Sequence, residues 1–129
     1  MKRSSQVVAI LGAMVFSVFF TANVSAQTGP VAGVYENFTL GKESGDLEGM
    51  RVVIIPAHNT FYAMVQIAQG GAEDPKPEFV DATVKGNTVE FKVGDIKYTG
   101  IVSIAGLRLK DPDGKTHVLK RRPCATLFR

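Results

Sequence analysis

The sequence predicts an all-β fold: a small antiparallel up-and-down meander barrel of about eight strands, with a two-sheet sandwich as the alternative. In residues 27–129, apolar and polar residues alternate at the period expected of half-buried strands, and no stretch keeps the helical period. Gly, Pro, Asn and Asp interrupt the runs roughly every eight to twelve residues. Such short connections make sequence neighbours sheet neighbours, and closing the barrel removes the two open edges of a meander.

The first two strands are expected on either side of a polar loop. Residues 32–40 form the first run, and residues 41–48 form the loop. The second strand covers residues 50–56, and its consecutive apolar residues 52–55 are typical of a strand covered on both faces. Three apolar residues of the first run share one face: Val34, Phe38 and Leu40.

The third and fourth strands are expected at residues 60–69 and 78–84. The loop between them, residues 70–77, contains Pro75 and Pro77, which lack the backbone donor that a central strand needs. The third strand alternates regularly, so that one of its faces is apolar throughout. The residues on this face are Phe61, Ala63, Val65 and Ile67.

The last four strands are expected to follow one another through short turns. Gly86-Asn87 suits a two-residue hairpin turn. The Asp-Pro-Asp-Gly segment at residues 111–114 has Pro and Gly where a tight turn favours them. It lacks the further ligands of a calcium-binding loop, so we predict a turn rather than a calcium site. The four ranges are 88–93, 96–104, 107–110 and 116–121.

Residues 1–26 have the composition of a cleaved secretory signal peptide. Lys2 and Arg3 provide the positive start, residues 7–20 the apolar segment, and small residues the cleavage site at its end. We therefore expect a periplasmic or secreted bacterial protein in which residues 27–129 form a single β-barrel domain. The apolar segment is shorter than the roughly 20 residues that span a bilayer, so a retained anchor is the weaker alternative and the mature chain is expected to have no membrane span.

Charge argues against a nucleic-acid partner. Because Lys2 and Arg3 leave with the leader, the 15 basic residues of the chain fall to 13, against 12 acidic ones. This balance lacks the basic footprint of a nucleic-acid-binding protein. The end of the chain is nevertheless basic, and residues 120–129 are compatible with an acidic partner, lipid head groups or lipopolysaccharide, or with a solvated strand end.

Cys124 is the only cysteine, which excludes an internal disulfide in an exported chain. The fold must therefore be held by packing and by sheet hydrogen bonds. We interpret Cys124 as a half-buried thiol, with an intermolecular disulfide or a reactive thiol as the alternatives.

The pattern resembles the small meander barrels of the lipocalin and avidin type. Residues 33–35 (Gly-Val-Tyr) stand where the first lipocalin strand has Gly-x-Trp, and Arg121 or Arg122 falls where those folds place a closing arginine over that aromatic ring. The final hairpins, residues 98–121, are similar to those of small exported bacterial barrel domains. The chain has no Trp and no long helix after the last strand, so the resemblance implies a shape and transfers no ligand-binding residue.

The favoured functional surface is an outward-facing apolar strip. If the alternating residues of the third strand fill the interior, Tyr62 and Met64 lie outside, next to the second apolar face of the preceding strand, which carries Val53 and Ile55. Exposed apolar strips often mark partner sites, so we predict a protein–protein interaction there. A homodimer contact or cover by a terminal tail are the alternatives.

A carrier of a small apolar ligand, held in the barrel mouth, is the alternative function. An eight-stranded barrel is just wide enough for side chains or one small ligand. Four aromatic residues are expected to fill the interior, and this favours the interaction module. They are Phe38, Phe61, Phe91 and Tyr98.

No catalytic, metal or cofactor site is expected, and the protein is predicted not to be an enzyme. His58 is expected in a turn and His117 on an exposed strand, at different barrel ends, whereas a metal site needs three or four ligands. The acidic residues from Glu36 to Glu48 lie among Gly, Ser and Lys, which predicts an ordinary polar surface. Nucleophile and phosphate-binding signatures are missing from the sequence.

Overall fold

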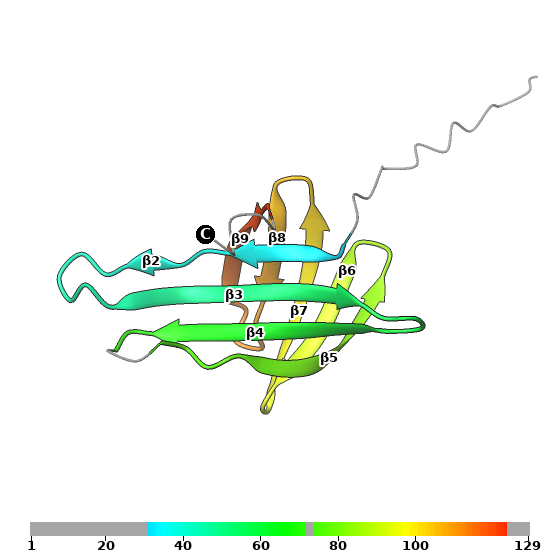
Figure 1. Cartoon of the computed structure of the whole chain (residues 1–129), viewed down its shortest axis with the longest axis horizontal. Coiled ribbons are helices and arrows are strands. Elements are labelled where there is room, and N and C mark those ends of the chain that lie inside the picture. Colours follow the sequence, from blue (N-terminus) through cyan, green and yellow to red (C-terminus); the bar gives the residue numbers. More distant parts are fainter. Residues whose placement is uncertain (1–30, 72–73, 124–129) are drawn as a thin grey trace, which may run out of the picture.

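In the computed structural model, which describes residues 31–71 and 74–123, eight antiparallel strands close into a barrel and one short strand extends beside it (Figure 1). The predicted meander barrel is confirmed. Residues 1–26, which carry the signal-peptide prediction, and Cys124 lie outside the described residues. The strands are β1 (Gly33–Glu36), β2 (Thr39–Leu40), β3 (Leu47–Pro56), β4 (Phe61–Gln69), β5 (Glu78–Lys85), β6 (Thr88–Val93), β7 (Ile96–Ser103), β8 (Gly106–Lys110) and β9 (Thr116–Arg122).

The barrel closes through β1. Each strand from β3 to β9 pairs antiparallel with its neighbour in sequence, and β1 pairs with both β3 and β9. Three residue pairs join β1 to β9, from Val34 opposite Arg122 to Glu36 opposite Lys120. This short contact removes both edges of the meander, so it determines whether the sheet is open or closed.

The first predicted strand, residues 32–40, is divided into β1 and β2. Both parts pair with β3 in one register, with Glu36 opposite Arg51 and Thr39 opposite Glu48. No residue is therefore inserted between the two parts, and β2 continues the line of β1 along β3.

Asn37 causes the interruption between β1 and β2. Its side-chain oxygen, in place of a backbone carbonyl, accepts the N–H of Met50 at 2.8 Å, while its own N–H donates to the Met50 carbonyl at 3.0 Å. The loop predicted at residues 41–48 is shorter than expected, because β3 already begins at Leu47, where it pairs with β2.

Side chains fill the interior. On β4 the predicted inward face is confirmed: Ala63 and Val65 are buried, and Phe61 and Ile67 pack against the core. The remaining buried residues of this core come from β1, β3 and the strands β5 to β9. They are Tyr35, Met50, Val52, Ile54, Ala82, Val89, Phe91, Tyr98, Val102, Leu107, Leu109 and Leu119.

Phe38 does not fill the interior, so that prediction is wrong. It follows the Asn37 interruption and lies on the outer surface, where the guanidinium carbon of Arg51 is 5.1 Å from the centre of its ring. Because β1 and β2 share one register with β3, alternation places Phe38 on the same outer face as Glu36, whose carboxylate binds the same Arg51. The other three aromatic residues predicted for the interior do contribute to it: Phe61, Phe91 and Tyr98.

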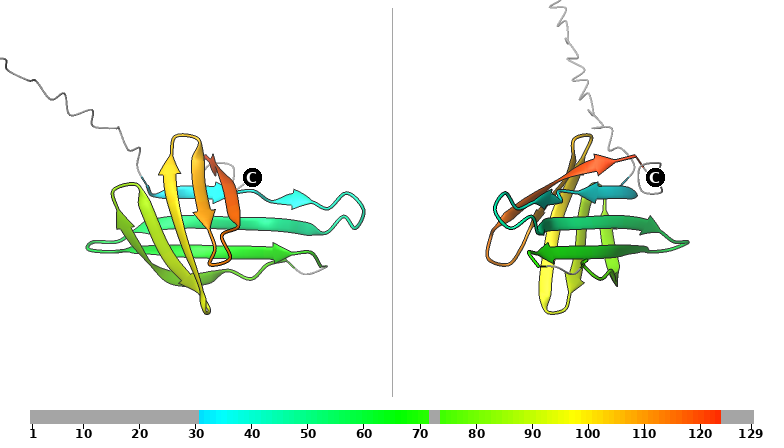
Figure 2. Two further views of the ribbon diagram at one scale, coloured as in Figure 1. Left: turned by 180° about the vertical axis from the view of Figure 1, so that it is seen from behind. Right: turned by 60° about the vertical axis from the view of Figure 1, so that its left-hand side comes forward.

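β5 changes partner at Ala82. Its residues 78–82 pair with β4, and its residues 82–85 pair with β6. Both views in Figure 2 show the result: β3 and β4 run across the direction of β6 to β9, and β5 curves between the two sets. Residues 78–81 consequently pair with a strand on one side only, among the residues that the structure describes.

Arg121 closes one end of the barrel over Tyr35. Its guanidinium carbon is 5.0 Å from the centre of the Tyr35 ring, and its Nη2 donates to the Tyr35 hydroxyl at 2.7 Å. That hydroxyl in turn donates to the Val31 carbonyl at 2.7 Å. Of the two arginines predicted for this position, Arg121 is the one that stacks on the ring; Arg122 faces outward.

Glu36 is not part of a solvated polar loop, which corrects the prediction for this residue. It lies in β1, where its carboxylate accepts the Nε–H of Arg51 at 2.8 Å and forms an ion pair with Arg122, whose Nε is 3.0 Å away. Glu36 therefore joins β3 and β9 across the short strand that closes the barrel.

Candidate functional site

The four residues predicted to form a functional strip lie together on the outer surface of β3 and β4. The register places Val53 opposite Met64 and Ile55 opposite Tyr62, while the residues between them point into the core. Directly opposed side chains of an antiparallel pair touch, so the four make one continuous apolar surface. We call Val53, Ile55, Tyr62 and Met64 the outer strip.

Phe79 extends the outer strip onto β5, and the sequence reasoning missed it. It lies opposite Met64 and is 70% exposed. The signal was available in the alternation of β5, because Val80 and Ala82 face the core and strict alternation then places Phe79 outside. One exposed Phe in a sequence does not indicate a binding surface. Phe79 does so here because it lies next to the outer strip.

Exposure along this surface rises from β1 towards β5. Val34, which lies opposite Val53 on β1, is 2% exposed. Val53 is half-buried, whereas Ile55 and Tyr62 are exposed and Phe79 is the most exposed of the series. The accessible part of the surface is therefore formed by Ile55 on β3, Tyr62 on β4 and Phe79 on β5.

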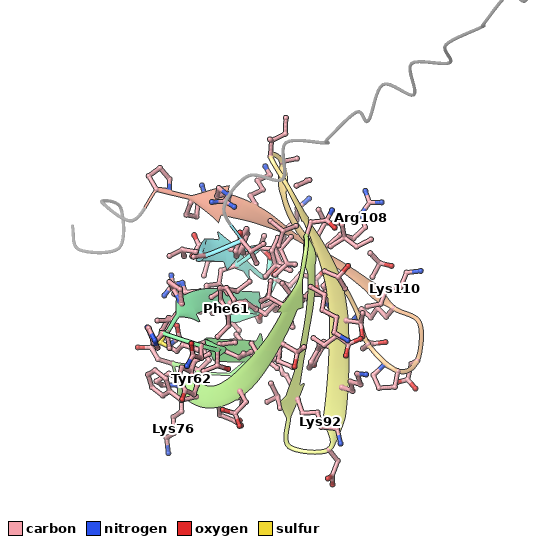
Figure 3. All side chains as sticks on the ribbon, turned by 90° about the vertical axis from the view of Figure 1, so that its right-hand side faces the viewer. Phe61, Tyr62, Lys76, Lys92, Arg108 and Lys110 are labelled. Carbon is pink, nitrogen blue, oxygen red and sulfur yellow. The ribbon has the colours of Figure 1, made fainter. Side chains whose placement is uncertain are left out.

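A hollow of about 680 Å³ adjoins the outer strip where β5 turns away from β6. Tyr62 and Phe79 form its apolar border, and Phe91 contributes from the core. Asp81 and Lys92 line it from β5 and β6. Figure 3 shows Tyr62 and Lys92 in the lower part of the molecule, beside the curve of β5.

A second hollow, of about 450 Å³, lies at the barrel end opposite Tyr35. Met50 and Tyr98, both buried, form its floor. The ring of His117 approaches that of Tyr98 edge-on at 6.3 Å between centroids, and its Nε2 is 3.2 Å from Oδ2 of Asp111. Burial, and then the nearby Asp111 charge, raise the pKa of Tyr98, so its hydroxyl is neutral at physiological pH.

Asp111 organises the turn between β8 and β9. Its Oδ1 accepts the N–H of Lys115 at 2.9 Å, and its carbonyl accepts the N–H of Gly114 at 3.0 Å, which confirms the predicted tight turn. Burial would raise the pKa of its carboxyl. The hydrogen bonds from His117 and from the Lys115 N–H outweigh burial and hold this pKa below its ordinary value of 3.8.

Acidification is expected to remove a stabilising contribution of Asp111. Because the folded-state pKa is depressed, the ionised carboxylate stabilises the fold fully above pH 3.8, and this contribution is lost as the pH falls through the lower folded value. Thermal melts followed by circular dichroism should show Asp111→Asn less stable than the wild type near neutral pH, with the gap narrowing between about pH 5 and pH 2. Asp113→Asn removes a carboxylate from the same turn but keeps the contacts of Asp111 with Lys115 and His117, so this control should retain the acid-dependent loss of stability; a constant gap for Asp111→Asn would contradict the assignment.

The two histidines lie at opposite ends of the barrel, as predicted. His58 is exposed in the turn between β3 and β4, at the Tyr35 end. His117 is half-buried against Asp111, so the prediction of an exposed strand histidine is wrong for it.

Within residues 31–71 and 74–123, no group of three or more His, Cys, Asp or Glu residues is placed to hold a metal ion. The same residues contain no helix with the length and apolar character needed to cross a membrane.

Comparison with known proteins gave no match among protein-family models, curated proteins or solved structures.

Proposed function

We propose that this protein is an exported binding module without catalytic activity, which acts by protein–protein interaction through the outer strip. The observation that supports this most is the register between β3, β4 and β5. It gathers Ile55, Tyr62 and Phe79, all exposed, on one outer surface rather than scattering them. Exposed apolar residues are ordinary singly, but a contiguous group of them is a feature of binding surfaces.

The composition of the surface fits the centre of a protein interface. Tyr, Phe and Met are enriched at such centres, and a few aromatic residues usually provide most of the binding energy. The hollow beside Tyr62 and Phe79 offers room for a side chain of the partner. Asp81 and Lys92 at its walls can contribute polar contacts around the apolar centre.

Replacing Tyr62 and Met64 together by serine is expected to abolish partner capture and leave the fold intact, since both side chains point outward. Loss of two central apolar contacts should weaken binding by about thirtyfold or more, the effect typical of hot-spot residues. The measurement is affinity capture with cross-linking from the exported fraction, with each captured protein then purified and titrated against both forms.

A matched pair of single substitutions controls for exposed apolar area. Phe79 and Leu40 are 70% and 69% exposed, but Leu40 lies on β2, away from the outer strip. Phe79→Ser should weaken capture and Leu40→Ser should not. If the partner is a second copy of the chain, light scattering will report a dimer that the Tyr62 and Met64 double variant loses. Capture that survives the double variant excludes this interface.

The alternative function is a carrier of a small apolar ligand in the barrel mouth. The hollow over Met50 and Tyr98 favours a position for the ligand at the mouth, above the packed core. Native mass spectrometry separates the two proposals. A small adduct that is lost on denaturation supports the carrier, and a heterocomplex or dimer without such an adduct supports the interaction module.

A further inference from the structure

The outer surface of β7, β8 and β9 contains no acidic residue. Residues 96–110 and 114–123 lack Asp and Glu altogether, and the alternation of these strands points several basic side chains outward. We define the basic face by five outward residues that the following argument uses. They are Ile101, Arg108, Lys110, Val118 and Lys120.

Its three basic side chains are not neutralised. Within the described residues, Arg108, Lys110 and Lys120 form no ion pair with a carboxylate. They project into solvent from neighbouring strands, so their charges add over one side of the barrel.

The carboxylates that border the basic face on β6 and β1 are already paired. Glu90 on β6 is 3.1 Å from Lys97, and Glu36 on β1 binds Arg51 and Arg122. Neither acid is therefore available to compensate the charge of the basic face. At the far end of the face, Asp111 is held by His117 in the barrel mouth, and Asp113 lies in the turn.

Exposed apolar side chains lie between the basic side chains of this face. Ile101, Arg108 and Val118 lie opposite one another in a row across β7, β8 and β9. Ile101 is 56% exposed and Val118 is 58% exposed, and Ile104 in the adjoining turn is exposed as well. Arg108 thus lies between two accessible branched aliphatic side chains.

We propose that the basic face docks this protein on an anionic lipid bilayer, as a peripheral contact. Lys and Arg side chains are attracted by anionic head groups, while adjacent aliphatic side chains reach the boundary between head groups and acyl chains. A nucleic acid would use the charge but not the aliphatic row, since bases are bound by aromatic stacking and hydrogen bonds. The occupant that matches both the charge and the exposed Ile101 and Val118 is the lipid surface.

The position of the basic face is compatible with the interaction proposed above. Figure 3 shows Arg108 and Lys110 pointing away from the barrel on the side opposite to Tyr62. Docking through the basic face therefore leaves the outer strip open to a protein partner. The lipid contact does not depend on that partner, because it uses different residues on a different side.

The test is co-sedimentation of the protein, isolated from the exported fraction, with vesicles of phosphatidylglycerol and phosphatidylcholine. We expect binding that weakens as salt is added, and no binding to vesicles of phosphatidylcholine alone. The triple variant Arg108→Gln, Lys110→Gln, Lys120→Gln should bind about a hundredfold more weakly, or ~3 kcal/mol, since each basic residue near an anionic surface contributes ~1 kcal/mol.

Two further variants make the result specific. Lys42→Gln with Lys76→Gln removes charge from other exposed sites and should bind as the wild type does. Ile101→Ser with Val118→Ser should weaken binding even at low salt, because it removes the aliphatic contact and keeps the charge. Equal binding to uncharged vesicles, or a loss per removed charge in the Lys42 and Lys76 variant equal to that of the basic-face variant, overturns the proposal. So does binding to duplex DNA as tight as to the anionic vesicles.

Discussion

Replacing Tyr35 by alanine is expected to lower the free energy of unfolding by about 3–5 kcal/mol, the range for removing a fully buried aromatic ring. The ring is inaccessible to solvent and is the largest of the fully buried side chains. Its loss would leave a cavity beneath Arg121 and would leave this guanidinium without the ring and the hydroxyl that it contacts. Because β1 joins β9 through three residue pairs, the cavity opens at the point where the barrel closes.

Urea denaturation followed by circular dichroism measures this effect. Tyr62→Ala is the matched control, since it removes the same side chain from the outer surface, and it should cost about 1 kcal/mol or less. Tyr35→Phe keeps the ring but leaves the Val31 carbonyl and Arg121 without the hydroxyl, and should cost about 1–3 kcal/mol. Equal values for Tyr35→Ala and Tyr62→Ala would contradict the closing role of Tyr35.

Gly106→Ala is the second substitution with a large expected effect. Gly106 begins β8 opposite Lys120, and its φ is 143°, a conformation that residues with a side chain rarely adopt. A Cβ built there would overlap the carbonyl oxygen of Leu119 and lie 3.0 Å from its carbonyl carbon. Because both atoms belong to the backbone of β9, the strand itself must shift, and we expect a loss on the order of 2–5 kcal/mol.

Gly114→Ala separates the cost of the positive φ from the cost of the close contact with the β9 backbone. Gly114 also has a positive φ, of 81°, but a Cβ there would have no heavy atom within 4 Å. Its substitution should therefore cost about 1–2 kcal/mol from backbone strain alone. Urea denaturation of both variants gives the comparison. If Gly106→Ala is no worse than Gly114→Ala, the close approach of β8 to β9 does not constrain the barrel.

The strands from residue 60 onward could be predicted from the sequence with small errors at their ends. Their alternation is regular, and each inward set, such as Ala63 with Val65, is bounded by turn residues. The tight turn at Asp111 could be predicted for the same reason, since its residues have specific backbone preferences. These features depend on neighbours in sequence, so a single chain reveals them.

The errors concern residues whose environment is provided by distant segments. Phe38 packs outside because the register with β3 places it on the face of Glu36, where Arg51 of β3 covers its ring. Glu36 is bound by arginines of β3 and β9. The error on His117 is of another kind, because alternation with the buried Leu119 already places His117 on the inward face of β9. Phe79 gained its significance only when the register placed it beside Met64.

By itself, the sequence determined the all-β class, the order of the strands and the inward face of most of them, because the alternation of side chains is a local property of each strand. The tertiary structure decided how the sheet closes, since the pairing of β1 with β9 joins segments from opposite ends of the described chain. It also decided which outward residues lie together. The outer strip and the basic face each combine side chains from several strands, and only the register between strands brings such residues side by side.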